Sequence, residues 1–292
     1  MQLTPDSFQS LADQACLAAT KAGALIASYR DREVEVRTKS AGDGLASQVV
    51  TEVDERSEEI ILDLLAPSIE RYDLAVLTEE REDDRQRLQK DYFWCIDPLD
   101  GTLPFTRGIP GYSVSIALVR KDGRPVIGVV FDPVANKLYR AVAGAGVQID
   151  GVMFKPTLRA EGPLNFFCDC TFPRHPEREA LIREVEAVAV HEGSPRVEVI
   201  EGGGAVLNAC RVLEQGPACY FKKPKLKDGG GSLWDFAATA CLFEEAGLHA
   251  RDFDGRPLDL NRTESTFMNH RGVCYASTSG LAAALRVGQD AT

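Results

Sequence analysis

The sequence lacks a hydrophobic run long enough to cross a bilayer, and it lacks an export signal. No stretch of its 292 residues approaches about 20 consecutive apolar residues. The N-terminus does not join a basic region to an apolar run and a small-residue cleavage site. These absences predict a soluble, cytoplasmic protein without a membrane partner.

Histidine is scarce, and cysteine is present without a metal-binding spacing. The four histidines are dispersed, and none of the eight cysteines belongs to a Cys-x-x-Cys pair. Cys168 and Cys170 are the one close pair, and no second cluster of ligands accompanies them. We therefore expect reduced, mostly buried thiols. A Gly-x-Ser-x-Gly nucleophile elbow is also absent.

Positive charge is in deficit. Lysine and arginine together number 33 against 44 acidic residues, which gives a formal net charge of −11 and a pI near 5.0. A nucleic-acid polymer is not an expected partner, because binding one requires an exposed basic patch that releases counterions. A small anionic substrate would need metal ions or a few lysines to reverse this charge locally.

The composition, 44% hydrophobic and 26% charged, is that of a globular chain with a sizeable core. In the first half, helical patterns cover 5–29 and 53–65, with a glycine-rich break at 39–44 between them; the second helix is expected to end before Pro67. Apolar runs predict strands at 75–77, 92–96, 112–119, 126–131 and 137–142. Turns between the last three imply a sheet of hairpin-linked strands.

The second half alternates strands with helices, which is the pattern of an α/β unit. The expected strands are 165–169, 196–200 and 218–221, and the expected helices are 176–190, 204–214 and 233–247. The last four residues are expected to fray. The prediction is an α+β half, 1–155, joined to an α/β half, 156–292, with two sheets and helices packed on and between them.

The main motif for chemistry is Asp-Pro-Leu-Asp-Gly-Thr at 97–102, directly after an apolar strand. Asp97 and Asp100 leave the sheet edge able to face one point, and oxygen ligands are what a hard cation such as Mg2+ selects. The amides of Gly101 and Thr102, if they open a helix, would offer donors to a phosphate. Ordinary turn chemistry is the alternative interpretation of the same residues.

Three further blocks accompany this motif: Thr-Glu-Val-Asp at 51–54, Thr-Glu-Glu at 78–80 and Trp-Asp-Phe-Ala-Ala at 234–238. In this order the four blocks resemble the inositol monophosphatase superfamily, which includes the 3'(2'),5'-bisphosphate nucleotidases and the fructose bisphosphatases. The resemblance covers most of the chain. It implies a layered α-β-α-β-α sandwich, usually dimeric, that hydrolyses phosphomonoesters with two or three Mg2+ ions.

The resemblance also implies a role for single residues. The metal ligands would be Glu79, Asp97, the carbonyl of Leu99, Asp100 and Asp235. Asp54, Glu79 and Thr102 would be catalytic, because they would support and orient the water that attacks phosphorus. Three alternatives stay open: Glu80 is the ligand in place of Glu79, Asp54 is a surface carboxylate of a first helical turn, and Asp235 only begins a helix.

The predicted substrate-binding residues are Gly101, Thr102, Gly203, Gly204, Ala205 and Lys222. Lys222 opens a loop with four lysines, which either receives a second phosphate, as the similarity to bisphosphate nucleotidases implies, or is a solvated connector. Gly204 stands where inositol phosphatases commonly carry a hydroxyl residue. The stretch around Asn208 and Cys210, however, resembles the inositol enzymes.

The predicted function is a Mg2+-dependent phosphomonoesterase that acts on a small phosphorylated metabolite, either an inositol monophosphate or a 3'(2'),5'-bisphosphate nucleotide. A homodimer and lithium sensitivity are expected by resemblance. Two alternatives stay open: a sugar phosphatase of the fructose 1,6-bisphosphatase type, and a metal-binding regulator without turnover.

Overall fold

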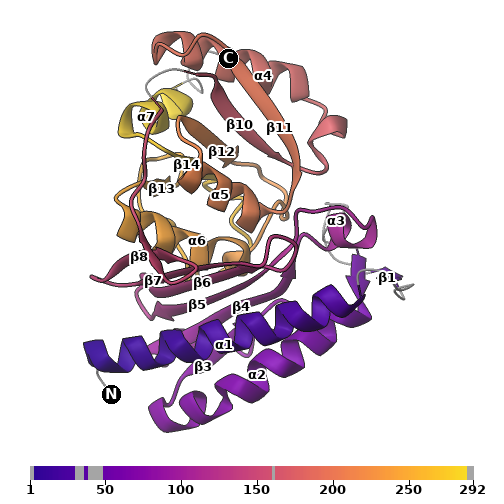
Figure 1. The fold of residues 1–292 in the computed structure, drawn as a ribbon, viewed down its shortest axis with the longest axis vertical. Helices are drawn as coiled ribbons and strands as arrows, with labels where there is room; N and C mark the ends of the chain where they lie inside the picture. Colours follow the sequence, from indigo (N-terminus) through magenta and orange to yellow (C-terminus); the bar gives the residue numbers. More distant parts are fainter. Residues whose placement is uncertain (1–2, 30–35, 39–48, 160–161, 288–292) are drawn as a thin grey trace.

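The computed structural model of the chain describes residues 3–29, 36–38, 49–159 and 162–287. The expected glycine-rich break at 39–44 and the expected fraying at 289–292 lie outside them. Five layers follow one another from bottom to top of Figure 1: two helices, a sheet, two helices, a second sheet and two more helices. The predicted α-β-α-β-α sandwich is therefore confirmed.

The first layer consists of α1 (Pro5–Tyr29) and α2 (Glu52–Tyr72), which pack on each other and on one face of the first sheet. Helix α1 has the predicted bounds. The prediction that the second helix ends before Pro67 is wrong, because α2 continues past the proline to Tyr72. Ile69 and Tyr72 pack against the buried core on this side, and that burial outweighs the backbone hydrogen bond that a proline removes.

The first sheet has seven strands in the order β3-β4-β5-β6-β7-β8-β9. They are β3 (Ala75–Thr78), β4 (Tyr92–Asp100), β5 (Ser113–Arg120), β6 (Pro125–Asp132), β7 (Lys137–Val142), β8 (Gly146–Ile149) and β9 (Val152–Phe154). From β4 onward each strand is antiparallel to the next, as the hairpin pattern predicted, whereas β3 and β4 are parallel.

Strand β4 is longer than predicted, and the difference concerns the main motif. The two aspartates do not follow the strand but belong to its last four residues: Asp97 pairs with Ser115 and Asp100 with Ser113, with a shift of register between them. On a regular strand, residues 97 and 100 would point to opposite faces of the sheet. The shift of register breaks this alternation, so both side chains can face one point. Gly101 then takes φ of 82° and begins the short helix α3 (Thr102–Thr106).

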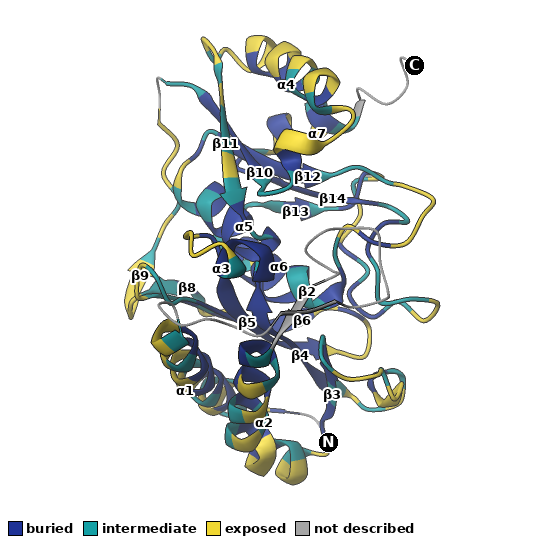
Figure 2. Cartoon of the chain, turned by 90° about the vertical axis from the view of Figure 1, so that its right-hand side faces the viewer, coloured by how far each residue is buried: buried dark blue, intermediate teal, exposed yellow. Residues whose placement is uncertain are grey.

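The middle layer consists of α5 (Ala205–Glu214) and α6 (Leu233–Ala246), which lie between the two sheets and are largely buried (Figure 2). One core cluster includes residues of both helices and of both sheets. Helix α6 approaches β6 very closely at Gly128, where an added Cβ would lie 2.3 Å from the carbonyl oxygen of Ala238. The glycine therefore sets the distance between α6 and the first sheet.

The second sheet has five strands in the order β11-β10-β12-β14-β13. They are β10 (Leu164–Asp169), β11 (Val197–Gly203), β12 (Ala218–Lys222), β13 (His249–Arg251) and β14 (Val273–Ala276). Strand β10 is parallel to both β11 and β12. The carboxyl ends of these three strands, at Asp169, Gly203 and Lys222, consequently lie at one edge of the sheet.

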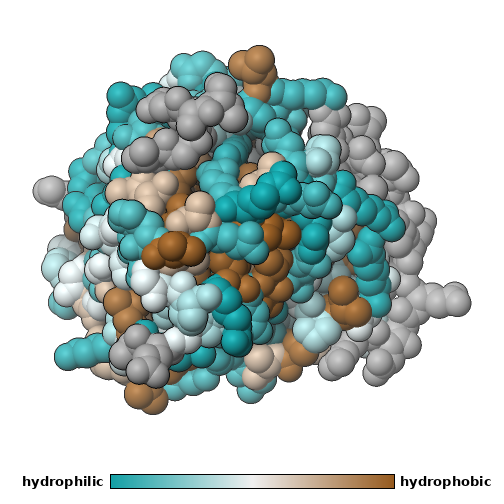
Figure 3. Space-filling model, turned by 90° about the horizontal axis from the view of Figure 1, so that it is seen from above, coloured by the Kyte–Doolittle hydropathy of each residue, from teal (hydrophilic) through white to brown (hydrophobic). Residues whose placement is uncertain are grey.

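The outer layer consists of α4 (Arg178–His191) and α7 (Ser279–Val287). Seen from above, the surface on this side is mostly hydrophilic, with hydrophobic side chains gathered near its centre (Figure 3). The remaining short elements are β1 (Val36–Thr38), β2 (Val49–Thr51) and two 3-10 turns, Gln86–Leu88 and Phe172–Arg174. None of the helices in the described parts of the chain is both long and apolar enough to cross a membrane.

The predicted division into 1–155 and 156–292 stays a prediction. The first sheet ends at Phe154 and the second begins at Leu164, close to the predicted boundary. Helix α6, however, belongs to the second half in sequence and packs on the strands of the first sheet. The described cysteines are all free thiols and most are buried, as expected.

Candidate active site

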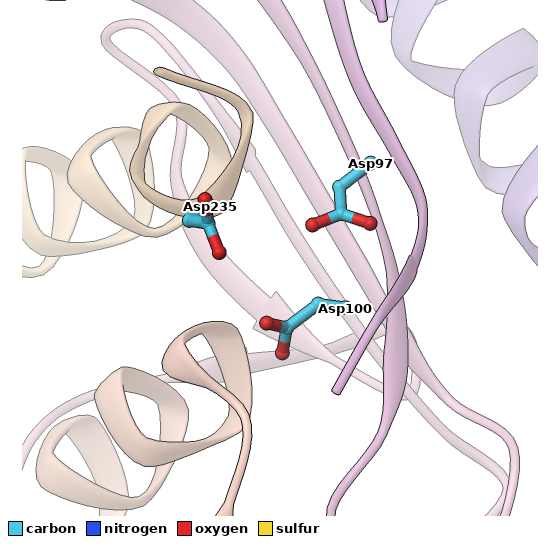
Figure 4. A group of neighbouring side chains, drawn as sticks. All are labelled: Asp97, Asp100 and Asp235. Carbon is cyan, nitrogen blue, oxygen red and sulfur yellow. The ribbon is translucent and has the colours of Figure 1, made fainter. Parts of the chain in front are cut away.

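Three buried or half-buried carboxylates converge at the point where the first sheet meets the middle helices. Asp97 and Asp100 come from the end of β4, and Asp235 comes from the first turn of α6 (Figure 4). Each offers an oxygen within 4.8 Å of the others. The geometry brings together three of the residues predicted to hold metal, from segments more than 130 positions apart in sequence.

Asp100 is held by the N-terminus of α5. The backbone amides of Ala205 and Val206 donate to its two carboxylate oxygens, each at 3.1 Å. An added Cβ on Gly204 would lie 2.4 Å from one of these oxygens. The glycine at this position therefore allows the backbone to approach the carboxylate, and the predicted substrate-binding amide of Ala205 is in contact with Asp100.

Asp235 begins a helix and faces the cluster at the same time. Its Oδ2 accepts the backbone N–H of Ser232 at 2.6 Å, so the carboxylate caps the N-terminus of α6. Asp235 therefore does begin the helix, as the alternative proposed. It does not do only this, because the same side chain also lies near Asp97 and Asp100. The capping bond fixes the direction in which the carboxylate points.

Asp54 and Thr102 lie beside the cluster. Asp54 is fully buried, so the alternative that it is a surface carboxylate is wrong. The hydroxyl of Thr102 lies 3.5 Å from Oδ2 of Asp54 and 3.2 Å from the carbonyl oxygen of Leu99. These contacts bring the predicted catalytic pair together and place it against the carbonyl predicted to bind metal.

Glu79 directly follows β3, which is the parallel neighbour of β4, so the carboxyl ends of the two strands meet at one edge. Glu79 is among the described residues that line the cavity at the carboxylate cluster, and Glu80 is not. The charge of Glu79 also acts on Asp97. Its position favours the prediction that Glu79, rather than Glu80, is the ligand.

The cluster concentrates negative charge at a largely buried position. Burial, together with the neighbouring charges of Glu79 and Asp100, raises the pKa of Asp97 well above its ordinary value. Burial and the charge of Asp235 likewise raise the pKa of Asp100. Buried carboxylates at this separation repel one another unless a cation balances them. An oxygen-only donor set with this excess of charge fits Mg2+.

Two cavities meet at the cluster. The smaller, of ≈ 250 Å³, is lined by the carboxylates and by the predicted substrate residues Gly101, Thr102, Gly203, Gly204, Ala205 and Lys222. The larger, of ≈ 680 Å³, is termed the side chamber here. The two share the lining residues Asp169, Cys170, Thr171, Lys222 and Gly230. A molecule bound at the carboxylates could therefore extend into the side chamber.

The side chamber joins an aromatic wall to a basic rim. Phe166 stacks on Phe221 and meets Phe172 edge to face, and all three line the chamber. Exposed basic side chains at its rim include Arg107 and Arg174. The three rings are themselves largely buried, so they give the chamber an apolar wall of small exposed area, and the basic rim offers contacts to a negative charge.

Lys222 and Lys223 of the lysine loop are paired with carboxylates. Lys222 lies 2.9 Å from Oδ2 of Asp169, and Lys223 forms an ion pair with Glu184 at 2.5 Å. Neither is a solvated connector residue, and the proposed receipt of a second phosphate stays a prediction. Asp169 was missed by motif reasoning; the signal that could have found it is a charged residue at the end of a parallel strand.

We expect the metal-free protein to become more stable as the pH falls from neutral. The pKa values of Asp97 and Asp100 are raised on folding, so the folded state takes up protons at a pH where the unfolded chain does not, and protonation relieves the repulsion. This gain is complete below the ordinary carboxyl pKa and is lost as the pH rises through the raised values. Urea unfolding in EDTA should therefore find Asp97→Asn more stable than the native protein at about pH 7.5.

The stability difference between Asp97→Asn and the native protein should shrink as the pH falls toward the ordinary carboxyl pKa, because the native carboxyl takes up a proton over this range. Saturating MgCl2 should reverse its sign near neutral pH, since the native protein alone keeps all its ligands. A difference that does not change with pH would contradict the assigned repulsion.

Comparison with known proteins is consistent with this geometry. The model of the Inositol monophosphatase family matches residues 8–289. The Nus factor SuhB of Pasteurella multocida (strain Pm70) is 32% identical over 241 residues, which cover 82% of this chain and 83% of that protein.

Solved structures share the fold. The inositol monophosphatase of Anabaena (Nostoc) sp. PCC 7120 superposes with a TM-score of 0.68 at 24% identity, covering 97% of this chain and 96% of that one. An IMPase/NADP phosphatase complexed with NADP and Ca2+ has a TM-score of 0.73 at 19% identity, with 98% and 97% covered. At these identities the likeness concerns the arrangement of layers.

Proposed function

We propose that this chain, which belongs to the inositol monophosphatase family, is a Mg2+-dependent phosphomonoesterase. The observation that carries the proposal is the convergence of Asp97, Asp100 and Asp235 on one cavity. A site that merely stabilised the fold would not gather two buried carboxylates and a half-buried one within 4.8 Å of one another, because their repulsion costs stability.

Each residue of the site has a proposed role. Glu79, Asp97, the carbonyl of Leu99, Asp100 and Asp235 would hold two or three Mg2+ ions. Bound Mg2+ supplies positive charge to the phosphoryl and leaving oxygens and lowers the pKa of water. Thr102, held between Asp54 and the Leu99 carbonyl, would orient the attacking water, and Asp54 and Glu79 would accept its proton.

The substrate is proposed to be an inositol monophosphate or a 3'(2'),5'-bisphosphate nucleotide. Gly101, Thr102, Gly203, Gly204 and Ala205 would bind the scissile phosphate and the first part of the leaving group. The side chamber favours the nucleotide, because its aromatic wall and basic rim suit a base and a second phosphate. The NADP named with the IMPase/NADP phosphatase is likewise a ligand with aromatic rings and further phosphates.

The test is phosphate release by purified protein with MgCl2 or EDTA, from inositol 1-phosphate and from 3'-phosphoadenosine 5'-phosphate. We expect release only with MgCl2, and a kcat/KM at least about tenfold higher for the nucleotide, since one extra charge-assisted contact contributes about 1.5 kcal/mol or more. Release that is equal in EDTA would overturn the metal dependence. A preference for inositol 1-phosphate would assign the substrate to the other class.

The basic rim can be tested separately. Arg174→Ala should lower kcat/KM for the nucleotide by about tenfold and leave that for inositol 1-phosphate within about twofold. Arg183→Ala is the matched control, because Arg183 is an exposed arginine on α4 that does not belong to the described chamber lining. Equal effects of the two variants would remove the rim from substrate recognition.

Two other functions stay open. A sugar phosphatase of the fructose 1,6-bisphosphatase type would show release from sugar bisphosphates in the same assay. A metal-binding regulator without turnover would bind MgCl2 and release no phosphate, and the relatives named Nus factor SuhB are the reason to keep this candidate. The homodimer, cytoplasmic location, lithium sensitivity and absence of a nucleic-acid or membrane partner stay predictions.

A further inference from the structure

Asp169 is a carboxylate at the site that the proposed reaction does not use. It ends β10, at the boundary between the small cavity and the side chamber. Its Oδ1 accepts the hydroxyl of Tyr220 at 2.9 Å and the side-chain amide of Asn208 at 3.2 Å. Its Oδ2 lies 2.9 Å from the ammonium of Lys222. Two neutral donors therefore fix one oxygen and direct the other at the lysine.

Lys222 pairs with Asp169 and also lines the cavity at the carboxylate cluster. It ends β12 and lines the small cavity together with Asp100 and Asp235. Its Nζ lies 5.8 Å from the ring centre of Phe236, the residue that follows Asp235 on α6. Burial raises the pKa of Asp235, and the ammonium of Lys222 opposes that rise, so the lysine and the cluster already interact across the cavity.

An ammonium on a flexible four-carbon stem next to three clustered carboxylates is an internal competitor for a metal ion. If Lys222 moved into the cluster, it would balance part of the charge that Mg2+ would otherwise balance. The ion pair with Asp169 opposes this movement, and the two further bonds to Asp169 keep that carboxylate in place. Removing the negative charge of Asp169 would leave the cluster as the main attraction for the ammonium.

We propose that Asp169 is a positioning residue that holds the Lys222 ammonium outside the carboxylate cluster and thereby keeps the cluster open to Mg2+. The inference rests on the proposed function in one respect, because it requires that Asp100 and Asp235 bind the metal. Its consequence is a coupling: the effect of Lys222 on metal affinity depends on whether Asp169 carries its charge.

The test is a double-mutant cycle read by isothermal titration of MgCl2 into metal-free protein, without substrate. Asp169→Asn should weaken Mg2+ binding by about tenfold, while Lys222→Met in the native background should change the Kd by about twofold or less. In the Asp169→Asn background, Lys222→Met should restore most of the lost affinity. A mere loss of negative charge at position 169 predicts a different result, in which Lys222→Met has the same effect in both backgrounds, and that result would overturn the proposal.

Tyr220→Phe is the matched control. It removes one hydrogen bond to Asp169 but leaves the ion pair and the charges in place, so the Mg2+ Kd should stay within about twofold of the native value. A tenfold loss in Tyr220→Phe would show that any disturbance of this edge weakens the site, and it would overturn the specific role of the lysine. Native protein that binds no MgCl2 would overturn the metal site itself, whereas native binding without coupling would overturn this inference alone.

Discussion

Mg2+-dependent phosphate release should fall by about 10³-fold or more in Asp97→Asn, with the fold intact. Asp97 is buried, and its Oδ1 accepts the amide of Leu99 at 3.1 Å. An asparagine oxygen can keep that bond, so the change removes charge and little else. The loss of one of three clustered negative charges weakens metal binding and leaves phosphoryl charge uncompensated. The measurement is kcat at saturating MgCl2, together with titration of MgCl2 into the metal-free variant.

The control for this variant is Asp63→Asn, which removes the same charge from an exposed position on α2. It should keep kcat within about twofold of the native value, because exposed charges at a distance are screened. A kcat of Asp97→Asn equal to that of the native protein would contradict the assignment of the cluster as the catalytic metal site.

Gly128→Ala should lower the free energy of unfolding by about 3 kcal/mol and weaken Mg2+ binding as well. The new methyl group would meet the backbone of α6 at Ala238 and the Cβ of Cys241, and neither can rotate away. Helix α6 must therefore shift from the first sheet, and Asp235 would shift with it relative to Asp97. Urea unfolding in EDTA measures the first effect, and calorimetric titration of MgCl2 measures the second.

Gly144→Ala separates this effect from the general cost of replacing glycine. Gly144 has φ of 77° and no atom within 4 Å of an added Cβ, so alanine there should cost about 1 kcal/mol through backbone strain alone. Its Mg2+ affinity should be native. An equal loss of Mg2+ affinity in both variants would mean that the close contact at Gly128 does not position Asp235.

Features that depend on nearby residues could be predicted from the sequence. The apolar spacing of α1 is a local pattern, and its bounds match the prediction. The residues of the carboxylate cluster also belong to short motifs, so each could be named before their separation in space was known. The layered arrangement followed from the resemblance carried by those motifs.

Features that depend on distant packing could not be predicted. Pro67 ends a helix by local rules, but burial of residues beyond it extends α2. Asp169 belongs to no motif, and its importance arises only because β10, β11 and β12 are parallel and end at one edge. Gly128 belongs to the resemblance, but the close approach of α6 that requires a glycine there is visible only in the structure.

The placement of α6 between the sheets has a consequence for how the protein can vary. The same helix separates the two sheets and carries Asp235, one of the three carboxylates of the cluster. Side-chain volumes deep in the interior, far from any ligand, therefore adjust the gap between Asp235 and the aspartates of β4. Substitutions in the core can tune affinity for a cation without changing a single residue that touches it.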